Sequence, residues 1–256
     1  MTRFLELAAV RYAYLGQKNA ALDVVQDVVR GVSLHISPGD FHCLIGRSGC
    51  GKTTLLKLAA GLLQAQSGAI ALQGVAVTGP NPHMGFVFQT PTLLDWLTVL
   101  DNVLLPIALH GQVQAAQREK AMALLDQLGL KDLQSRYPQQ LSGGQQSRVA
   151  IARALINAPP ILFMDEPFAS LDAITRSELQ QDLLALCQSQ GTSVLFITHD
   201  IAEAVYLADH VSVMQAGALC HQLTVDLPHP RQPTLRFTPD FNARCAELRQ
   251  AMDGSL

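Results

Sequence analysis

The sequence predicts an α/β protein with a mixed sheet at its core, an antiparallel β subdomain near the N-terminus and an inserted helical subdomain. Three patterns lead to this class. After residue 158, strand-like and helical segments alternate, which implies parallel strands. Residues 4–45 run as short apolar or alternating segments, typical of antiparallel strands with hairpins. Between these parts, residues 98–158 have a helical pattern that interrupts the strands, as an inserted subdomain would.

The N-terminal third is expected to contain strands, one helix and several turns. Within residues 4–45 the breaks fall at Gly16, Gly31 and Pro38-Gly39, and the apolar run 41–45 ends at a glycine. Residues 69–88 read as a strand, a turn over 79–82 and a second strand. Residues 52–63 have helical spacing, with four apolar side chains on one face: Leu55, Leu58, Ala59 and Leu62.

The rest of the chain continues this order. The helical block is broken at Gly111, Gly129 and Pro138, and Thr98 with Asp101 resembles an N-terminal capping pair. We then expect a strand over 160–164 buried on both faces, and further elements over 175–190 (helix), 193–198 (strand), 200–208 (helix) and 210–215 (strand). Prolines 228, 230 and 233 change the character of the tail, and a helical stripe follows: Phe241, Cys245, Leu248 and Met252.

Composition narrows the functional class. The 256 residues are 48% apolar but only 15% charged, against about 25% in typical soluble proteins. No window is apolar enough for a membrane-spanning helix, even in the uncharged stretch Leu58–Leu94, and Met1–Glu6 lacks the features of a secretory signal. The net charge of −3 argues against nucleic-acid binding, and five cysteines without metal-ligand spacing indicate reduced thiols. We therefore expect a cytosolic protein.

The strongest motif is a phosphate-binding loop of the GxxxxGK[ST] type between a predicted strand and a predicted helix. Its glycines let backbone N–H groups surround a phosphate, and the helix N-terminus adds its dipole. Lys52 can reach the outer phosphates and the Thr53 hydroxyl can hold Mg²⁺. The candidate ATP-binding residues of this loop and the following helix are Gly46, Ser48, Gly49, Cys50, Gly51, Lys52, Thr53 and Thr54.

A second motif pairs two carboxylates at the end of a predicted strand. The apolar residues 161–164 are followed by Asp165 and Glu166. Because ligands of parallel sheets bind beyond the carboxyl ends of the strands, Asp165 is expected to face the Mg²⁺ of the nucleotide. Glu166 is placed to orient or deprotonate a water that attacks the γ-phosphate.

A third motif, Leu141-Ser142-Gly143-Gly144-Gln145, resembles the signature sequence of ABC ATPases. Ser142 can cap a helix, and two glycines leave its N-terminus open for an anion. The resemblance implies a head-to-tail dimer that holds two ATP molecules between its subunits. Each ATP would contact the phosphate loop of one chain and Ser142, Gly143, Gly144 and Gln145 of the other.

Further positions resemble the same family in the same order and cover about residues 4–220. Tyr14 sits where an aromatic ring stacks on adenine, although Tyr12 could take this role. Gln89 resembles the Q-loop glutamine that contacts Mg²⁺ and water, and Ser170-Leu171-Asp172 resembles the D-loop at the dimer interface. His199 resembles the switch histidine that contacts the γ-phosphate. The resemblance thus implies four catalytic residues: Lys52, Gln89, Glu166 and His199.

Several segments are similar to import ATPases of the nitrate/sulfonate/taurine type, among them residues 91–103 and 168–176. This similarity implies an ATP-hydrolysing importer subunit on the cytoplasmic side of the membrane, with a second ATPase subunit, a transmembrane permease and, indirectly, a solute-binding protein as partners. The segment after Gln89 is then expected to receive the permease through an apolar groove, with four candidates: Leu93, Leu94, Trp96 and Leu97. The competing interpretation is that they pack inside the subdomain.

Three features depart from the family pattern: Gln146-Ser147 replaces a more usual Arg-Gln, the link Gly16–Arg30 is long, and Cys50 lies inside the phosphate loop. Cys50 is either a small residue that fits or a site of redox control.

The alternatives to an importer are a soluble or export-type ABC ATPase and a non-catalytic module. The sequence does not identify the transported solute.

The sequence predicts a single ATPase domain over residues 1–225. Its core segments are 1–97 and 159–225 and its helical insert is 98–158, and a proline-rich link and a helix follow over 226–256.

Overall fold

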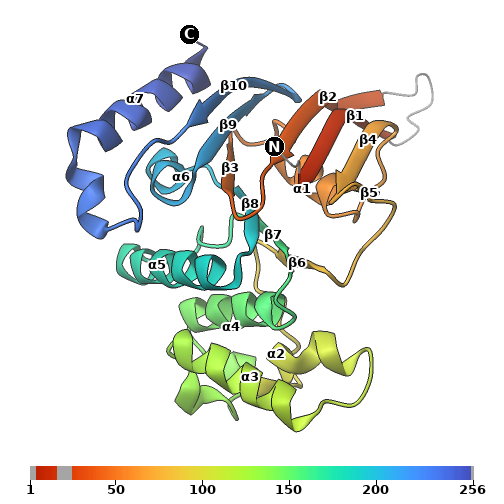
Figure 1. The fold of residues 1–256 in the computed structure, drawn as a ribbon, viewed down its shortest axis with the longest axis vertical. Coiled ribbons are helices and arrows are strands. Elements are labelled where there is room, and N and C mark those ends of the chain that lie inside the picture. Colours follow the sequence, from red (N-terminus) through yellow and green to blue (C-terminus); the bar gives the residue numbers. More distant parts are fainter. Residues whose placement is uncertain (1–3, 16–24, 255–256) are drawn as a thin grey trace. The chain divides into compact units, whose positions relative to one another are not determined.

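The computed structural model describes residues 4–15 and 25–254 (Figure 1). The chain forms two compact units, one made of residues 1–81 and 193–256 and the other of residues 82–192. The turn expected at Gly16, most of the long link that begins there, and the first three residues of the segment Met1–Glu6 lie outside the described residues. The helical insert predicted over 98–158 falls within the second unit.

An antiparallel sheet opens the first unit. Its strands run in the order β2-β1-β4-β5, and every neighbouring pair is antiparallel, as the sequence predicts for this subdomain. The break expected at Gly31 is wrong, because β2 continues through it. Gly31 adopts φ +72 and is skipped in the pairing with β1, so it forms a bulge that only locally shifts the register. The strands are β1 Leu5–Leu15, β2 Val25–Ile36, β4 Ser67–Leu72 and β5 Val75–Ala76.

A second set of strands in this unit carries the phosphate loop. The apolar run predicted over 41–45 is β3, Phe41–Ile45, and it pairs in parallel with β8, Ser193–Ile197, and β9, His210–Gln215. All residues of β3 and β8 are buried, which explains their unbroken apolar character. β10, Ala218–Thr224, pairs antiparallel with β9 and is a strand that the sequence analysis missed.

Two short helices connect these strands. α6, Ile201–Leu207, follows β8, and α1, Lys52–Ala59, follows β3. The sequence predicts α1 as far as residue 63, but it ends earlier. The reason is Gly61, which adopts φ +71 and lies so close to the chain that a Cβ there would be 2.2 Å from the carbonyl oxygen of Gly79. Leu62 therefore leaves the predicted apolar face and is 40% exposed.

The second unit contains a parallel strand pair and four helices. β6, Met84–Val87, and β7, Ile161–Asp165, are parallel neighbours. The predicted capping pair is confirmed, since the Thr98 hydroxyl accepts from the Asp101 N–H at 3.1 Å and donates to its carboxylate at 2.6 Å. Helical segments of this unit are α2 Val99–Ala108, α3 Ala115–Gln127, η1 Lys131–Leu133, η2 Pro138–Gln140, α4 Gly143–Leu155 and α5 Ala173–Gln190.

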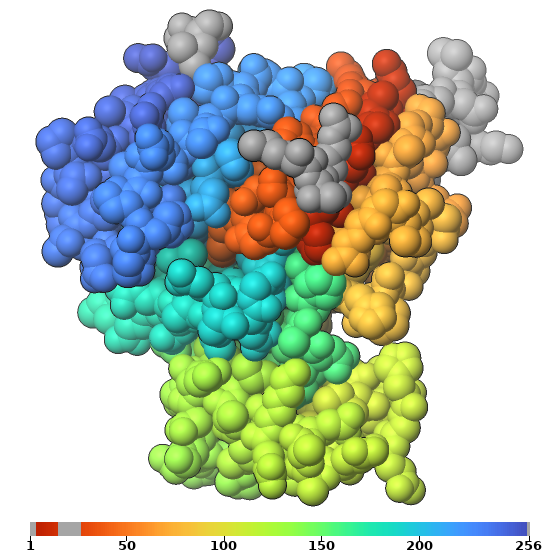
Figure 2. Space-filling view, viewed as in Figure 1, coloured from red at the N-terminus to blue at the C-terminus, as the bar shows by residue number. Residues whose placement is uncertain are grey.

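The C-terminal segment packs on the first unit. After the prolines it forms η3, Pro233–Phe237, and α7, Pro239–Asp253, which contacts α6, β9 and β10. Figure 2 shows this segment in dark blue beside the lighter blue of those elements. Phe241 and Leu248 of the predicted stripe are buried, whereas Cys245 and Met252 are half-buried. Within the described ranges, no helix has the length and apolar character needed to cross a membrane.

His42 in β3 gives the fold a testable pH dependence. Its Nε2 lies 2.9 Å from the Ser212 Oγ of β9 inside the core, and its ring stacks 6.0 Å from that of His210. Burial, together with smaller effects of the charges of His210 and His35, lowers the pKa of His42 from 6.5 to about 3. The folded protein therefore holds His42 neutral, while the unfolded chain takes up a proton below pH 6.5.

We predict that the free energy of unfolding falls as the pH decreases from about 6.5 toward 3, with a contribution from His42 of up to about 1.4 kcal/mol per pH unit. In His42→Gln this dependence should flatten, because glutamine cannot take up the proton. Urea unfolding at several pH values measures the effect, with His110→Gln, which removes an exposed histidine, as the matched control. A slope that is unchanged in His42→Gln would contradict the prediction.

Candidate functional site

The phosphate loop wraps around the side chain of its own lysine. β3 ends at Ile45, and the chain turns back so that Lys52 at the start of α1 is only 6% exposed. Its ammonium donates to the carbonyl oxygens of Gly46 at 2.8 Å and Arg47 at 3.2 Å. The Cys50 Sγ lies 3.9 Å from the same nitrogen. Lys52 thus holds the loop closed and carries a positive charge at its centre.

Two glycines of this loop are required by close approach. A Cβ on Gly46 would lie 2.2 Å from the carbonyl oxygen of Met214, and one on Gly51 would lie 2.4 Å from that of Val28. Gly49 also adopts a positive φ, of +78, but it faces open space, where a ligand could approach the backbone. The loop is therefore packed tightly on one side and open on the other.

The N-terminus of α1 is prepared for an anion. Gly51 occupies its N-cap position, and no side chain caps the helix, so the first N–H groups are available to a phosphate. Ser48, Gly49 and Thr53 are exposed there, whereas Thr54 is buried. This arrangement fits the phosphates of a nucleotide, and the exposed Thr53 hydroxyl in the first turn fits an Mg²⁺ ligand.

Tyr14 stands beside this helix, although it comes from β1. Its hydroxyl lies 3.4 Å from the Thr54 Oγ1, and its ring meets that of Tyr12 edge-on at 4.9 Å. The Tyr14 ring is 42% exposed, which leaves a face for stacking on a flat ligand. Tyr12 is half-buried, so of the two tyrosines Tyr14 offers the larger free surface.

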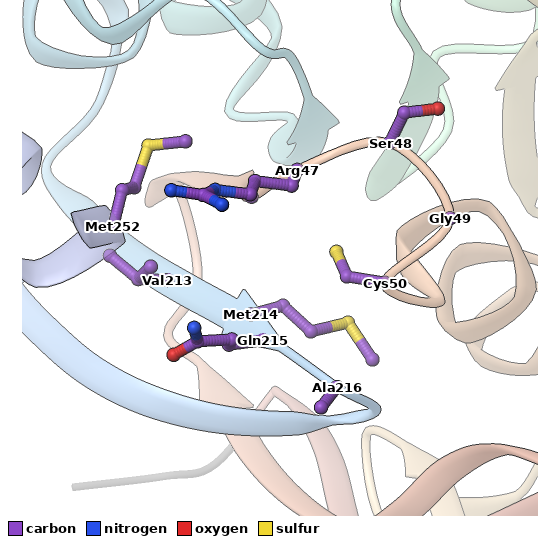
Figure 3. Close-up of a pocket in the computed structure, with 10 residues that line it drawn as sticks. Arg47, Ser48, Gly49, Cys50, Val213, Met214, Gln215, Ala216 and Met252 are labelled. Carbon is purple, nitrogen blue, oxygen red and sulfur yellow. The ribbon is translucent and has the colours of Figure 1, made fainter. Parts of the chain in front are cut away.

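A recess lies between the phosphate loop and the end of β9 (Figure 3). It has a volume of about 210 Å³, and Figure 3 shows the side chains of Cys50 and Met214 on one side and those of Arg47 and Met252 on the other. Met252 belongs to α7, so the C-terminal helix contributes to the wall behind the loop. No charged residue besides Arg47 lines this recess among the described residues.

His199 follows β8 in the same unit. The preceding residue, Thr198, is buried and its N–H donates to the carbonyl oxygen of Leu44 in β3 at 3.3 Å. His199 itself is exposed at the carboxyl end of β8, whose parallel neighbour β3 leads into the phosphate loop. His199 and the phosphate loop therefore stand at the same edge of this sheet.

The paired carboxylates lie in the second unit at the end of β7. Asp165 is 7% exposed, and Glu166 is half-buried and adopts φ +44. A non-glycine residue at positive φ is uncommon and is found preferentially at functional sites. This backbone turn takes Glu166 out of the strand direction while Asp165 stays in it. Gln89 comes two residues after the parallel neighbour β6 and is exposed.

The signature segment forms the start of α4 through reciprocal bonds. The Ser142 Oγ accepts from the Gln145 N–H at 3.3 Å, and the Gln145 Oε1 accepts from the Ser142 N–H at 2.9 Å. This capping box confirms that Ser142 caps a helix. Gly143 is exposed with open space around its Cα, so the helix N-terminus can meet an external group.

Gly144, the second glycine of the signature segment, allows close packing of two helices. A Cβ on Gly144 would lie 2.6 Å from the Thr175 Cγ2 of α5. Asp172, an exposed residue of the D-loop resemblance, is the N-cap of α5, and its carboxylate accepts from the N–H groups of Ile174 and Thr175 at 3.1 and 3.0 Å. The bonds from Thr175 hold the pKa of Asp172 below its ordinary value. Gly144 thus lets the signature helix and the D-loop helix touch at their N-termini.

Arginines on α4 make two further connections that the sequence analysis did not assign. Arg148 forms ion pairs with Asp182 and, at 3.4 Å, with Glu178 of α5. Arg153 donates to the carbonyl oxygens of Pro91 and Thr92, both at 2.9 Å, and burial lowers its pKa. In the sequence, the only sign of these connections is the position of two arginines five residues apart on a predicted helix. That pattern does not identify the groups that the arginines bind.

The segment 91–98 after Gln89, which Arg153 contacts, is also held by Asn102. Asn102 of α2 is fully buried, and its side chain accepts from the N–H of Leu94 and donates to the carbonyl oxygens of Leu94, Leu97 and Thr98. With its backbone fixed, the segment leaves Trp96 73% exposed, and Leu93, Leu94 and Leu97 half-buried.

Gln146 and Ser147, which depart from the usual family pattern after the signature segment, are both placed by the structure. Gln146 donates to the carbonyl oxygen of Pro138 at 3.0 Å, and Ser147 is buried.

The predicted residues divide between the two compact units. The phosphate loop, Tyr14 and His199 belong to the first unit, and the signature segment, Asp165, Glu166, Asp172 and Gln89 belong to the second. Among the described residues, no group of three or more His, Cys, Asp or Glu is arranged to hold a metal ion.

Comparison with known proteins finds matches over most of the chain. The ABC transporter family matches residues 29–169. The aliphatic sulfonates import ATP-binding protein SsuB 1 of Xanthomonas axonopodis pv. citri is 45% identical over 234 residues, which is 90% of each chain. The taurine import ATP-binding protein TauB of Chromobacterium violaceum is 47% identical over 208 residues, 81% of this chain and 77% of its own.

Two solved structures have a similar fold. One is the dimeric structure of a post-hydrolysis state of the ATP-binding cassette MJ0796 bound to ADP and Pi, with a TM-score of 0.77, 30% identity and coverage of 88% of this chain and 100% of that one. The other is cbiO1 from Clostridium perfringens, part of the ABC transporter complex cbiONQ, with a TM-score of 0.78, 26% identity and coverage of 99% and 98%. On these similarities, which span most of its length, the chain belongs to the ABC transporter family as an ABC-type ATPase.

Proposed function

We propose that the chain is the ATP-binding and ATP-hydrolysing subunit of a bacterial importer that takes up a small solute of the nitrate, sulfonate or taurine type. The observation that carries this proposal is that one chain contains two helix N-termini suited to phosphate, at α1 and at α4. The relatives named as sulfonate and taurine import proteins support the direction of transport and the class of solute. Its ATPase domain spans residues 1–225.

The phosphate loop binds the nucleotide. Lys52 places its ammonium at the centre of the loop, and the N–H groups at the start of α1 surround the phosphates. Tyr14 stacks on the adenine, since its partly exposed ring lies beside the same helix. Thr53, Asp165 and Gln89 are the residues that would hold Mg²⁺, which would supply positive charge to offset that of the phosphates.

Hydrolysis requires a base and a sensor. Glu166, turned out of β7 by its positive φ, orients and deprotonates the attacking water. Gln89 contacts that water from the end of β6, and His199 contacts the γ-phosphate from the end of β8. The buried Thr198 before His199 and the buried strand before Glu166 restrict both side chains.

A second copy of the chain completes each site. Ser142, Gly143, Gly144 and Gln145 stand at the N-terminus of α4. Because the phosphate loop already provides one phosphate site in each chain, this second site suits the nucleotide of a partner. We propose a head-to-tail homodimer in which Asp172 and its loop cross the interface. The dimeric structure of the MJ0796 cassette supports the formation of a dimer.

The permease docks on the segment after Gln89. Trp96 and the half-buried leucines 93, 94 and 97 form an apolar surface whose backbone is fixed by Asn102 and Arg153. An ordered apolar patch with one large exposed aromatic is typical of an interaction site. The subunit would then work at the cytoplasmic face of the membrane, and a solute-binding protein would deliver the cargo to the permease.

Glu166→Gln tests the assigned base. We predict that it retains ATP binding but loses turnover by about a hundredfold or more, because glutamine cannot accept the proton. With hydrolysis blocked, ATP should also hold the chain as a dimer in size-exclusion chromatography. Glu119→Gln, at an exposed position on α3, is the control that should keep both properties of the wild type. Turnover near wild type in Glu166→Gln would exclude Glu166 as the base.

Lys52→Ala tests nucleotide binding. Removing the ammonium also releases the carbonyl oxygens of Gly46 and Arg47, so we expect nucleotide affinity to fall at least about tenfold. Titration with a fluorescent ATP analogue measures the loss. The matched control is Lys57→Ala, which removes a half-buried lysine from the same helix. Equal affinity in Lys52→Ala and the wild type would contradict the role of Lys52.

Trp96→Ala tests the docking surface. Because a large exposed aromatic often dominates an interface, the amount that co-purifies with the permease should fall about tenfold or more. Leu109→Ala is the control, since Leu109 is an equally exposed apolar residue of the same unit, also 73% accessible. If both variants co-purify like the wild type, the permease does not dock through Trp96.

A further inference from the structure

The proposed function leaves the C-terminal segment, residues 225–254, without a role. This segment follows β10 and packs against α6 through α7 and η3. It also meets the phosphate loop at its far end, where Asp253 lies 3.4 Å from Arg47, but both side chains are largely exposed. An exposed ion pair contributes little, so this contact does not attach the segment firmly. α7 also contacts β9 and β10, but α6 is the element that both α7 and η3 contact.

Arg231 forms the buried part of that attachment. Its side chain is fully buried, and its Nη2 donates to the carbonyl oxygen of Ala208 at 2.8 Å and to that of Val225 at 3.4 Å. Ala208 is the C-cap residue of α6, so a positive charge stands where the helix dipole is negative. The Asp209 carboxylate at 3.8 Å balances the charge. The guanidinium therefore ties the segment to the end of α6.

Arg236 makes a second contact between the segment and α6, at Tyr206. Its Cζ lies 3.9 Å from the centre of the Tyr206 ring, a distance suited to a cation–π interaction. Tyr206 is in the last turn of α6 and is 1% exposed, and its hydroxyl donates to the carbonyl oxygen of Arg231 at 3.2 Å. Tyr206 is thus held by the backbone carbonyl of Arg231 and by the guanidinium of Arg236.

The other end of α6 leads directly to His199. Asp200 is its N-cap, and the Asp200 carboxylate accepts from the N–H of Glu203 at 3.1 Å. The N–H of Asp200 in turn donates to the hydroxyl of the buried Thr198 at 3.0 Å. His199 therefore stands between a fixed strand end and the first residue of α6, and a shift of α6 moves one of its two supports.

α6 cannot fix its own position. It has seven residues, which is too short for a helix that is stable by itself, so its place depends on what packs against it. Those partners are β3 on one side and η3 with α7 on the other. The C-terminal segment supplies the contacts to its last turn, where Tyr206 lies.

We propose that the C-terminal segment is a brace that positions α6, and through it His199, and that Arg236 is a positioning residue of this brace. The inference rests on the role proposed above for His199. The brace acts on the γ-phosphate contact and not on the phosphate loop, which Lys52 closes independently. Loss of the brace should therefore lower kcat and leave the KM for ATP nearly unchanged.

The test compares Arg236→Ala, Arg236→Lys and Arg244→Ala in the full-length chain. Arg236→Ala should lower kcat about tenfold, with KM within about twofold of the wild type, as expected when a reacting group is slightly misplaced. Arg236→Lys should restore most of the rate, because an ammonium also binds a ring face. Arg244→Ala is the matched control, since Arg244 pairs with Glu247 of its own helix at 3.4 Å.

Hydrogen exchange provides a readout that does not depend on activity. Peptides covering 198–207 should exchange faster in Arg236→Ala than in the wild type, while those covering α1 should not change. Unchanged kcat, unchanged exchange in 198–207, or equal losses in Arg244→Ala would each overturn the brace. His199→Ala, assayed alongside, separates the two proposals: wild-type turnover there refutes the role of His199, and exchange in 198–207 then decides on the brace alone.

Discussion

The burial of one ammonium group organises the nucleotide-binding half of this protein. Lys52 is satisfied by the carbonyl oxygens of Gly46 and Arg47, and the chain must curl through several residues to bring them there. That curl is possible only because Gly46 and Gly51 let the loop pass within contact of β9 and β2. The loop thereby fixes where α1 begins, and Tyr14 of the antiparallel sheet reaches the same helix through Thr54.

The second unit is organised by one helix in a comparable way. α4 begins with the capping box of Ser142 and Gln145 and contacts α5 through Gly144 and Arg148. Near its other end, Arg153 holds the segment after Gln89, which carries Trp96. The signature segment, the start of the D-loop helix and the segment that carries the proposed docking surface are therefore all joined to α4.

Local signals explain which predictions were confirmed. The capping pairs at Thr98 and Ser142, the buried strand at 41–45 and the breaks around Gly111 and Gly129 depend on residues within a few positions of each other, and the structure has each of them. Errors arose where a distant segment decides. Gly31 looks like a turn but forms a bulge against β1, α1 ends early because Gly61 meets Gly79, and β10 becomes a strand by pairing with β9 despite its weak pattern.

The sequence alone determined the family, the phosphate loop, the order of the motifs and the candidate residues for ATP chemistry, because those features are written in short contiguous segments. Only the tertiary structure decided which side chains support them. Arg153 and Arg236 are ordinary basic residues in the sequence, and their partners lie far away along the chain. Asn102 bonds nearby residues, but only the packed fold buries its side chain. The physical reason is that a buried donor or cation must find its acceptor or ring in whatever chain segment packs beside it, and packing is set by the whole fold.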